Sequence, residues 1–397
     1  MKRHNPDSLV VKITLLLTSS LTVMAGATIA PSLPAMQEHF ADVEHVEYLV
    51  KLALTMPALF IAIGGPIVGY LIDRLGRKPL LTGSTLLFAC AGSEGFMLDS
   101  LWGIIASRAL LGLSVAGTMT GVMTIISDYY QDQKRASFMG LQAAAMGIGG
   151  VVFISLGGIV ANFNWRFPFL IYLFALVVLV LISTTLSEPK LAKIDNTDHP
   201  GDRLKLPTGL LSTIYAIAFL YMVAYFLVIV QIPFYLDDLS NSSAAESGMA
   251  IAASTLAGAI ASSRYGALKK RLNFSTVVII ALVLTAIGQF VIGWGESYQL
   301  VLCGLIISGL GFGLMMPNLS VWLVSIVPNV FRGKALGGLT TFIFLGQFIS
   351  PVVFQPLINL VGFSKTYSLT GVLLLQAALT SLIVKISSAI VAEKLKN

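Results

Sequence analysis

The sequence predicts an all-α membrane protein with twelve transmembrane helices in two pseudo-symmetric six-helix bundles. Hydrophobic residues make up 56% of its 397 residues and charged residues only 11%, against roughly 25% charged in an average soluble domain. Apolar runs of about the 20 residues needed to cross a bilayer follow one another along the chain. Such a chain has too little polar surface to cover itself in water.

The distribution of charge predicts the orientation of the chain. With a cytoplasmic N-terminus, all of the 25 Lys and Arg lie in cytoplasmic segments except Lys51, Arg108, Arg166 and Lys365. Ten of the 19 acidic residues fall on the outer side. This asymmetry follows the positive-inside rule and predicts cytoplasmic N- and C-termini. No basic cluster is interleaved with aromatic residues, so the net charge of +6 does not indicate nucleic-acid binding.

The first predicted helix runs from about Val10 to Pro34. It has no obvious cleavage site followed by a soluble domain, so we expect a retained helix rather than a signal peptide. Five further spans complete the first half of the chain, separated by short polar or charged turns. They end near Tyr70, Met97, Ser127, Asn162 and Ser187.

The composition changes abruptly after the sixth span, where charged residues, Pro and Gly replace the apolar run. We expect a cytoplasmic linker at 188–207 between an N-terminal bundle, 1–187, and a C-terminal bundle, 208–397. Faint internal repetition at an offset of about 198 residues supports duplication. The six helices expected in the second half are at about 208–235, 247–268, 274–294, 299–327, 335–361 and 366–387.

The most specific pattern lies in the loop after the second helix. Its charges and glycines are Gly69, Asp73, Arg74, Gly76, Arg77 and Lys78. The glycines allow close approach or positive φ, and the cations hold the loop on the cytoplasmic side. The pattern Gly-x-x-x-Asp-Arg-x-Gly-Arg-Lys resembles the loop between helices 2 and 3 of the major facilitator superfamily of secondary transporters.

In that family the loop acts as a latch on the inner side. The resemblance implies that Asp73 faces the start of the eleventh helix, near Gly333 to Gly337. It also implies that Arg77 pairs with Asp128 at the end of the fourth helix. An ion pair that forms in one state and breaks in the other biases a two-state equilibrium. The alternative is that these charges only set topology, which would not require Asp73.

Arg108 lies about seven residues into the fourth helix, roughly 10 Å from its outer edge. A charge at this depth is costly unless it faces a cavity or a partner. The segment Arg108-Ala109-Leu110-Leu111-Gly112 resembles the family motif Arg-x-x-Gln-Gly, linked to proton coupling, with Leu111 in place of glutamine. Glu94 is the expected ion-pair partner if Arg108 is structural. It is a candidate proton carrier, as are Asp73 and Asp128, if protons are coupled.

The fifth helix resembles a further motif of exporter branches, Gly-x-x-x-Gly-Pro-x-x-Gly-Gly. Here the segment 149–158 has Phe153 and Ile154 in place of Gly-Pro. The flanking glycines still permit close helix contact of the small-x-x-x-small kind.

The cavity of this family is lined mainly by helices 1, 4, 7 and 10, which places candidate substrate contacts on helices 7 and 10. Tyr221 and Tyr225 share a helix face, with Gln231 further out, and Asn318 and Trp322 share another. Ordinary packing is the alternative for each pair. Together they indicate an apolar, aromatic pocket suited to amphipathic or lipophilic compounds.

We therefore expect a secondary transporter of the inner (plasma) membrane, most like the drug–proton antiporters, that exports such compounds by alternating access. The expected partners are a small-molecule substrate, protons and the lipid bilayer, with no cofactor or metal; a monomer is the family default. Nothing indicates an enzyme, because the chain has no phosphate loop and only four His.

Two alternatives remain open. One is an importer or facilitator of a small organic anion with Arg108 as its counter-charge, which the altered fifth helix and the few membrane carboxylates favour. The other is a non-transporting membrane receptor or scaffold, which predicts no cavity at the membrane midplane.

Overall fold

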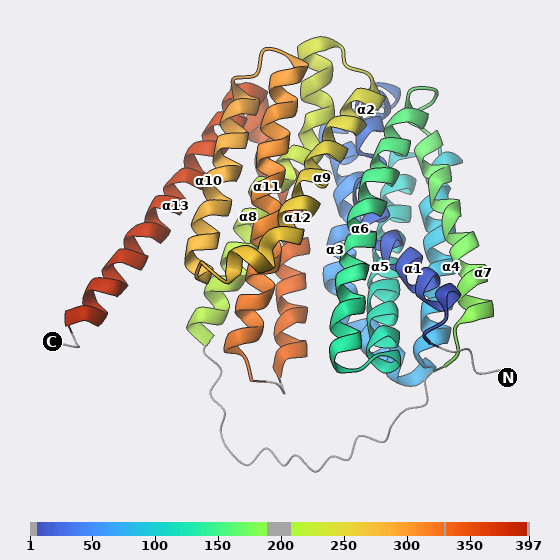
Figure 1. The fold of residues 1–397 in the computed structure, drawn as a ribbon. Helices are drawn as coiled ribbons and strands as arrows, with labels where there is room; N and C mark the ends of the chain where they lie inside the picture. Colours follow the sequence, from blue (N-terminus) through green and yellow to red (C-terminus); the bar gives the residue numbers. More distant parts are fainter. Residues whose placement is uncertain (1–5, 189–207, 329–330, 395–397) are drawn as a thin grey trace.

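The computed structural model describes residues 6–188, 208–328 and 331–394, and these are folded into helices joined by short turns (Figure 1). The predicted linker, apart from Glu188, lies outside the described residues. The elements of the N-terminal half are α1 Leu9–Ala27, η1 Ala30–Ser32, α2 Leu33–His39, α3 Val46–Leu75, α4 Arg77–Ser93, η2 Glu94–Phe96, α5 Leu101–Tyr129, α6 Asp132–Ala161, η3 Phe167–Leu173 and α7 Phe174–Thr185. Those of the C-terminal half are α8 Thr208–Ser240, α9 Ala244–Lys269, α10 Phe274–Gly293, α11 Tyr298–Ile326, α12 Arg332–Val361 and α13 Phe363–Lys394.

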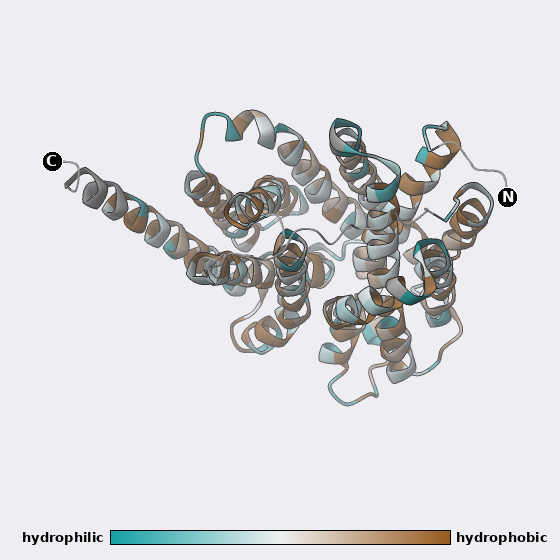
Figure 2. Cartoon of the chain, turned by 90° about the horizontal axis from the view of Figure 1, so that it is seen from below, coloured by the Kyte–Doolittle hydropathy of each residue, from teal (hydrophilic) through white to brown (hydrophobic). Residues whose placement is uncertain are grey.

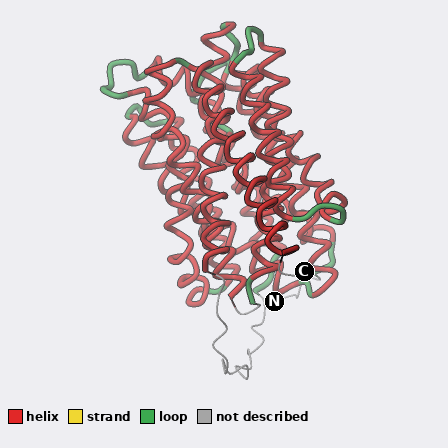
Figure 3. The backbone as a smooth tube through the Cα atoms, turned by 90° about the vertical axis from the view of Figure 1, so that its left-hand side faces the viewer, coloured by secondary structure: helices red, strands yellow, loops and turns green. Residues whose placement is uncertain are grey.

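The predicted fold class is confirmed. Within the described residues, 11 helical segments are long and apolar enough to cross a membrane, and α1 with α2 counts as one of them. The helix α4 has 17 residues and lies between two of these spans, so it completes the twelve-helix arrangement. The helices run side by side along one direction (Figure 3).

The two halves of the chain lie next to each other, with α1–α7 on one side and α8–α13 on the other (Figure 1). Seen from below, they form two groups of helices (Figure 2). Many large hydrophobic residues of the described helices are exposed. The end of α7 and the start of α8 both lie at the lower end in Figure 1, which the charge distribution predicts to be cytoplasmic. The helix α13 diverges from the bundle toward its C-terminal end.

The first span differs from its prediction because two prolines interrupt it. The helix α1 ends at Ala27, and the chain continues through η1 and α2 as far as His39. Pro31 and Pro34 each lie in the first turn of these short helices. That is where a proline is tolerated, because the first amide groups of a helix have no partner within it.

Single glycines make the tightest turns between antiparallel neighbours. Gly76 separates α3 from α4 with φ of 90°, and Gly362 separates α12 from α13 with φ of 82°. An L-amino acid with a side chain rarely adopts this conformation. The sequence predicts that Gly76 allows either close approach or positive φ, and the structure shows positive φ.

The two halves meet at their outer ends, where α6 packs against α9. A Cβ added to Gly158 would lie 2.7 Å from the Ala244 carbonyl oxygen and 3.0 Å from the Gly248 Cα. Beside this contact, the Ala245 amide donates a hydrogen bond of 3.0 Å to Asn162 Oδ1. The close helix contact that the glycines of the fifth helix permit is thus made across the interface between the halves.

Three hydrogen bonds join the halves within the described residues, and all lie toward the outer side. One is the Asn162–Ala245 bond. The second links Asn359 of α12 to Glu47 in the first turn of α3. The third runs from Lys51 Nζ to Gln355 Oε1. The structure is therefore a state in which the outer ends are closed.

We expect Gly158→Ala to destabilise the closed contact by about 1–3 kcal/mol, because the new methyl group overpacks two backbones. Thermal unfolding of the purified protein should show a lower midpoint. Gly140→Ala on the same helix is the matched control, since a Cβ there would have no neighbour within 4 Å. Equal midpoints for the two variants would contradict this account of the α6–α9 contact.

Candidate translocation site

The loop that carries the family pattern is tied to neighbouring helices of its own half. Arg77 Nε lies 3.2 Å from Asp128 Oδ2 at the end of α5, so the predicted contact is present. Lys78 Nζ donates to the carbonyl oxygens of Ser183 and Leu186, at 2.8 Å and 2.7 Å, and so caps the end of α7. The loop thus joins α4, α5 and α7 at the inner side.

Glu188 is a partner of this loop that sequence reasoning missed, because it was assigned to the linker. Its carboxylate accepts the backbone N–H groups of Arg77, at 2.7 Å, and Lys78, at 2.8 Å. These are the first amides of α4, where the helix dipole favours an anion. A Cβ on Gly76 would lie 2.7 Å from Glu188 Oε1, so Gly76 provides space as well as positive φ.

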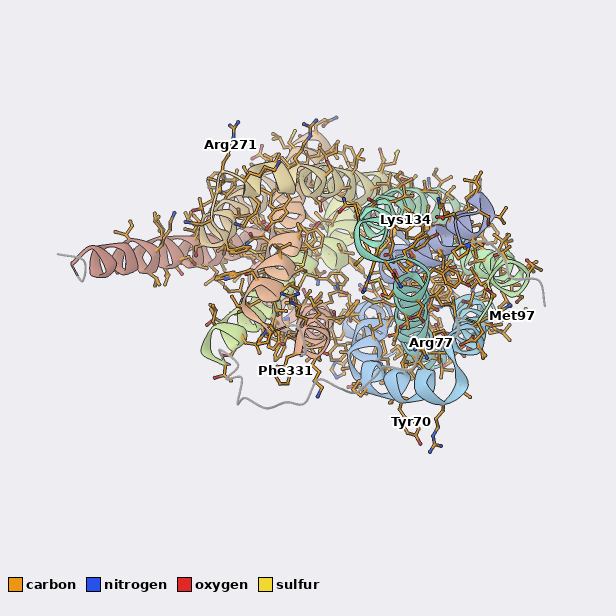
Figure 4. The ribbon with its side chains drawn as sticks, turned by 60° about the horizontal axis from the view of Figure 1, so that its bottom comes forward. Tyr70, Arg77, Met97, Lys134, Arg271 and Phe331 are labelled. Carbon is orange, nitrogen blue, oxygen red and sulfur yellow. The ribbon has the colours of Figure 1, made fainter. Side chains whose placement is uncertain are left out.

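The remaining loop residues make fewer contacts. The Arg74 guanidinium lies 4.5 Å from the Tyr70 ring centre on the outside of the molecule. In Figure 4, Tyr70 points away from the helices, Arg77 lies among them, and Phe331 belongs to the other half. The side chain of Asp73 lies outside the described part of the structure. A Cβ on Gly69, Gly333 or Gly337 would have no neighbour within 4 Å.

Arg108 is fully buried within the N-terminal half. Its Nη2 donates to the carbonyl oxygens of Ala91, at 3.1 Å, and Gly92, at 2.5 Å. These carbonyls belong to the last turn of α4, which has no intrahelical donors for them. The guanidinium also lies 4.9 Å from the ring centres of both Phe169 and Tyr172. Arg108 therefore caps the outer end of α4.

Glu94, the expected ion-pair partner of Arg108, forms no ion pair with it among the described residues. Glu94 instead begins the short helix η2, with its side chain exposed. The Nε and Nη1 groups of Arg108 have no hydrogen-bond acceptor within the described residues. Two donor groups of this buried guanidinium are therefore left without a partner among the described residues, which is uncommon for buried polar groups.

The two tyrosines on α8 point into the C-terminal half. The Tyr221 hydroxyl lies 2.7 Å from Thr285 Oγ1 of α10. Tyr225 stacks on Phe312 of α11, with ring centres 4.2 Å apart, and its hydroxyl lies 3.5 Å from Ser254 Oγ of α9. Both side chains are buried.

The pair on α11 also packs inside the C-terminal half. Asn318 Oδ1 accepts a hydrogen bond of 3.1 Å from the Tyr265 hydroxyl, and Asn318 Nδ2 donates one of 3.1 Å to the Phe274 carbonyl. Trp322 stacks on the Phe274 ring.

Of the five residues predicted for the substrate cavity, Gln231 reaches the interface between the halves, where it donates to Gln355 Oε1 at 3.1 Å.

A small cavity of about 30 Å³ lies between the two halves. Its lining residues are mostly apolar, with Thr22 and Gln347 as the polar side chains. They come from α1, α3, α8 and α12: Thr22, Ala25, Gly26, Leu54, Pro57, Ala58, Ile61, Phe226, Phe344 and Gln347. The first and seventh spans contribute as the family pattern implies, whereas the second and eleventh line this cavity in place of the fourth and tenth.

A twelve-helix fold with a cavity between its two halves is typical of secondary transporters. The sequence matches the family model of the Major Facilitator Superfamily over residues 15–240 and 214–391. The chain belongs to this family.

Curated relatives cover most of the chain at low identity. The Bacillibactin exporter of Bacillus subtilis (strain 168) is 24% identical over 361 residues, which are 85% of this chain and 87% of the relative. Multidrug resistance protein 1 of the same organism is 26% identical over 352 residues, 86% of this chain and 88% of the relative.

Solved structures show the same fold. The xylose transporter XylE from E. coli in an inward open conformation has a TM-score of 0.77 at 16% identity, covering 94% of this chain and 95% of that one. A bacterial homologue of the human lysosomal transporter Spinster has a TM-score of 0.72 at 16% identity, covering 98% and 97%.

We expect Arg108→Met to destabilise the protein by roughly 1–3 kcal/mol for each α4 carbonyl left unpaired. Arg108→Lys should lose less, because an ammonium can still donate to a carbonyl but cannot stack between two rings as a guanidinium does. Denaturant or thermal unfolding of both variants measures this order. A Met variant as stable as the original protein would show that the capping bonds contribute nothing.

Proposed function

We propose that the protein is a proton-coupled exporter of small amphipathic or lipophilic compounds that works by alternating access. Its proposed setting is the inner (plasma) membrane, with cytoplasmic termini and a monomeric chain. The observation that carries the proposal is the cavity shared by both halves, below contacts that close their outer ends. A site sealed at one end between two halves is what alternating access requires.

The lining of the cavity supports the substrate class. Aliphatic side chains together with Phe226 and Phe344 provide an apolar surface, while Thr22 and Gln347 provide hydrogen bonds. Such a lining favours amphipathic or lipophilic compounds over sugars, which need many polar contacts. The names of two relatives, an exporter and a multidrug resistance protein, favour the outward direction.

The proposed latch consists of Gly69, Asp73, Arg74, Gly76, Arg77, Lys78 and Asp128. Within it, the Arg77–Asp128 pair fixes the loop to α5, so the loop moves as part of the N-terminal half. We propose that Asp73 binds the first turn of α12 when the inner ends close. An interaction made in one state only shifts the equilibrium toward that state.

For proton coupling we propose Arg108 and Glu94, as the sequence suggested. The donors of Arg108 that have no described acceptor can bind water next to the guanidinium. The alternative in which Arg108 is the counter-charge of an imported anion draws no support from its contacts, which are carbonyls and rings of its own half. The cavity likewise favours a transporter over a receptor or scaffold.

Liposomes that contain the purified protein and a pH-sensitive dye test the proposed function. With an imposed proton gradient, lipophilic cations, neutral drugs and amphipathic anions are added in turn. We expect at least one of these classes to trigger proton movement, and Arg108→Met, matched for folded protein, to abolish it. Uptake of an organic anion without proton movement would contradict proton-coupled export.

Asp73→Asn tests the latch. We expect transport to fall roughly 5- to 20-fold, because a state-specific interaction is typically worth a coupling of that size. In a variant with Gly333→Cys and both native cysteines replaced by serine, Asp73→Asn should increase labelling of the new thiol by a membrane-impermeant maleimide from the inner side. Glu296→Gln, an exposed acid on the outer side, is the control. Unchanged labelling would rule out the proposed contact.

A further inference from the structure

Lys51 lies on the helix face that lines the cavity, one turn further toward the outer side. Leu54, Ala58 and Ile61 of α3 line the cavity, and Lys51 precedes Leu54 by three residues. Residues with this spacing share a face of a helix. At 1.5 Å per residue, Lys51 is about 4.5 Å beyond Leu54 along the helix axis. Its side chain is only 2% exposed.

The other two helices around Lys51 continue the cavity in the same way. Phe234 follows the lining residue Phe226 by about two turns of α8, and Gln355 follows Gln347 by the same interval on α12. Lys51 Nζ lies 4.3 Å from the centre of the Phe234 ring and donates to Gln355 Oε1. We call Lys51, Gln231, Phe234 and Gln355 the outer cluster; it closes the cavity toward the outside.

The hydrogen bonds of the outer cluster give Lys51 a neutral acceptor. Gln355 Oε1 accepts from Lys51 and, at 3.1 Å, from Gln231. Gln355 Nε2 donates to Asn359 Oδ1 at 2.7 Å, and Asn359 Nδ2 donates to Glu47 Oε1 at 2.9 Å. The carboxylate of Glu47, one turn outward on α3, is thus bound by Asn359. Lys51 forms no ion pair with any described residue.

One further polar atom of the outer cluster is unused. Gln231 Oε1 is buried and has no hydrogen-bond partner among the described residues. A buried cation with a single neutral acceptor, beside an unpaired amide oxygen, is energetically expensive. Glu47 attracts the Lys51 cation from one helical turn away but makes no ion pair with it, so a ligand with its own negative charge would supply the direct ionic contact that the site lacks.

We propose that Lys51 binds an anionic group of the substrate, such as a carboxylate or sulfonate, as the substrate leaves through the outer end. This proposal rests on the proposed export function and narrows it to amphipathic anions. When α12 moves away from α3, Lys51 loses Gln355 Oε1 and the substrate's oxygen takes its place. A cationic compound would meet a like charge in an apolar passage, which costs several kcal/mol. Arg108 does not compete, because it is bound to α4.

Transport by inside-out proteoliposomes tests this with three probes that share one ring system: naphthalene sulfonate, naphthyl-trimethylammonium and a neutral naphthyl glucoside. We expect the sulfonate to be transported at least about tenfold faster than the cation. Lys51→Gln should lower sulfonate transport about tenfold, as expected for the loss of roughly 1.4 kcal/mol of binding, and leave the glucoside nearly unchanged. Lys51→Arg should keep the preference for the sulfonate, and Lys51→Glu should reverse it.

Lys365→Gln is the matched control, because Lys365 is an exposed lysine near the outer end of α13. Equal changes in all three rates would make Lys51 a gate residue only and overturn the proposal, as would a charge preference that Lys51→Glu leaves intact.

Transport of none of the probes would count against the proposed export function. Binding of naphthalene sulfonate to the purified protein, followed by its fluorescence, still tests Lys51 in that case. Affinity about tenfold lower in Lys51→Gln supports the proposal, and equal affinity overturns it.

Discussion

The cost of an unpaired polar group inside a bilayer governs where the charged side chains of this protein lie. Each such group costs several kcal/mol when hydrocarbon replaces water. Short hydroxyl side chains meet this requirement locally: Thr14 and Thr18, for example, donate to carbonyls one turn earlier on their own helix. Long cations meet it through tertiary contacts. Arg108 caps α4. At the outer surface, Arg166 Nη2 lies 2.6 Å from Asp99 Oδ1.

The contacts fall into two groups with different consequences for movement. Arg108, Arg77 and Lys78 find all their partners within one half, so a rigid rotation of the halves leaves those bonds intact. Lys51 of α3 depends instead on Gln355 and Phe234, which belong to the opposing half. For Lys51 this means that the closed outer end satisfies the cation, and that in the proposed cycle an open outer end would expose it. The network of Lys51 is therefore coupled to the conformational state of the molecule.

The sequence allowed the fold and the inner loop to be predicted because both depend on local patterns. Apolar run length and the positive-inside rule place the spans, and the loop pattern predicted the contact of Arg77 with Asp128. The partner Glu188 lies 111 residues from Arg77. Its role depends on how α7 ends against α4, which no periodicity records. The prolines of the first span were visible, but their effect on its geometry was not.

The cavity was harder to predict than the fold, for a physical reason. Tyr221, Tyr225, Asn318 and Trp322 are aromatic or polar residues on suitable spans, yet their hydrogen bonds and ring contacts are all made inside one half. A helix face alone does not distinguish packing within a half from packing between halves.

Lys51 is a residue whose contacts between the halves could likewise not be predicted from the sequence. Its position outside the cytoplasmic segments marked it as unusual, but its partner Gln355 is 304 residues away. Lys51 and Arg108, the two buried cations among the described residues of the spans, are costly to desolvate, and their surroundings give them different roles. Arg108 stabilises the end of a helix through contacts within one half. Lys51 lies at a contact between the halves, so in the proposed export cycle its charge would be presented to the substrate that leaves.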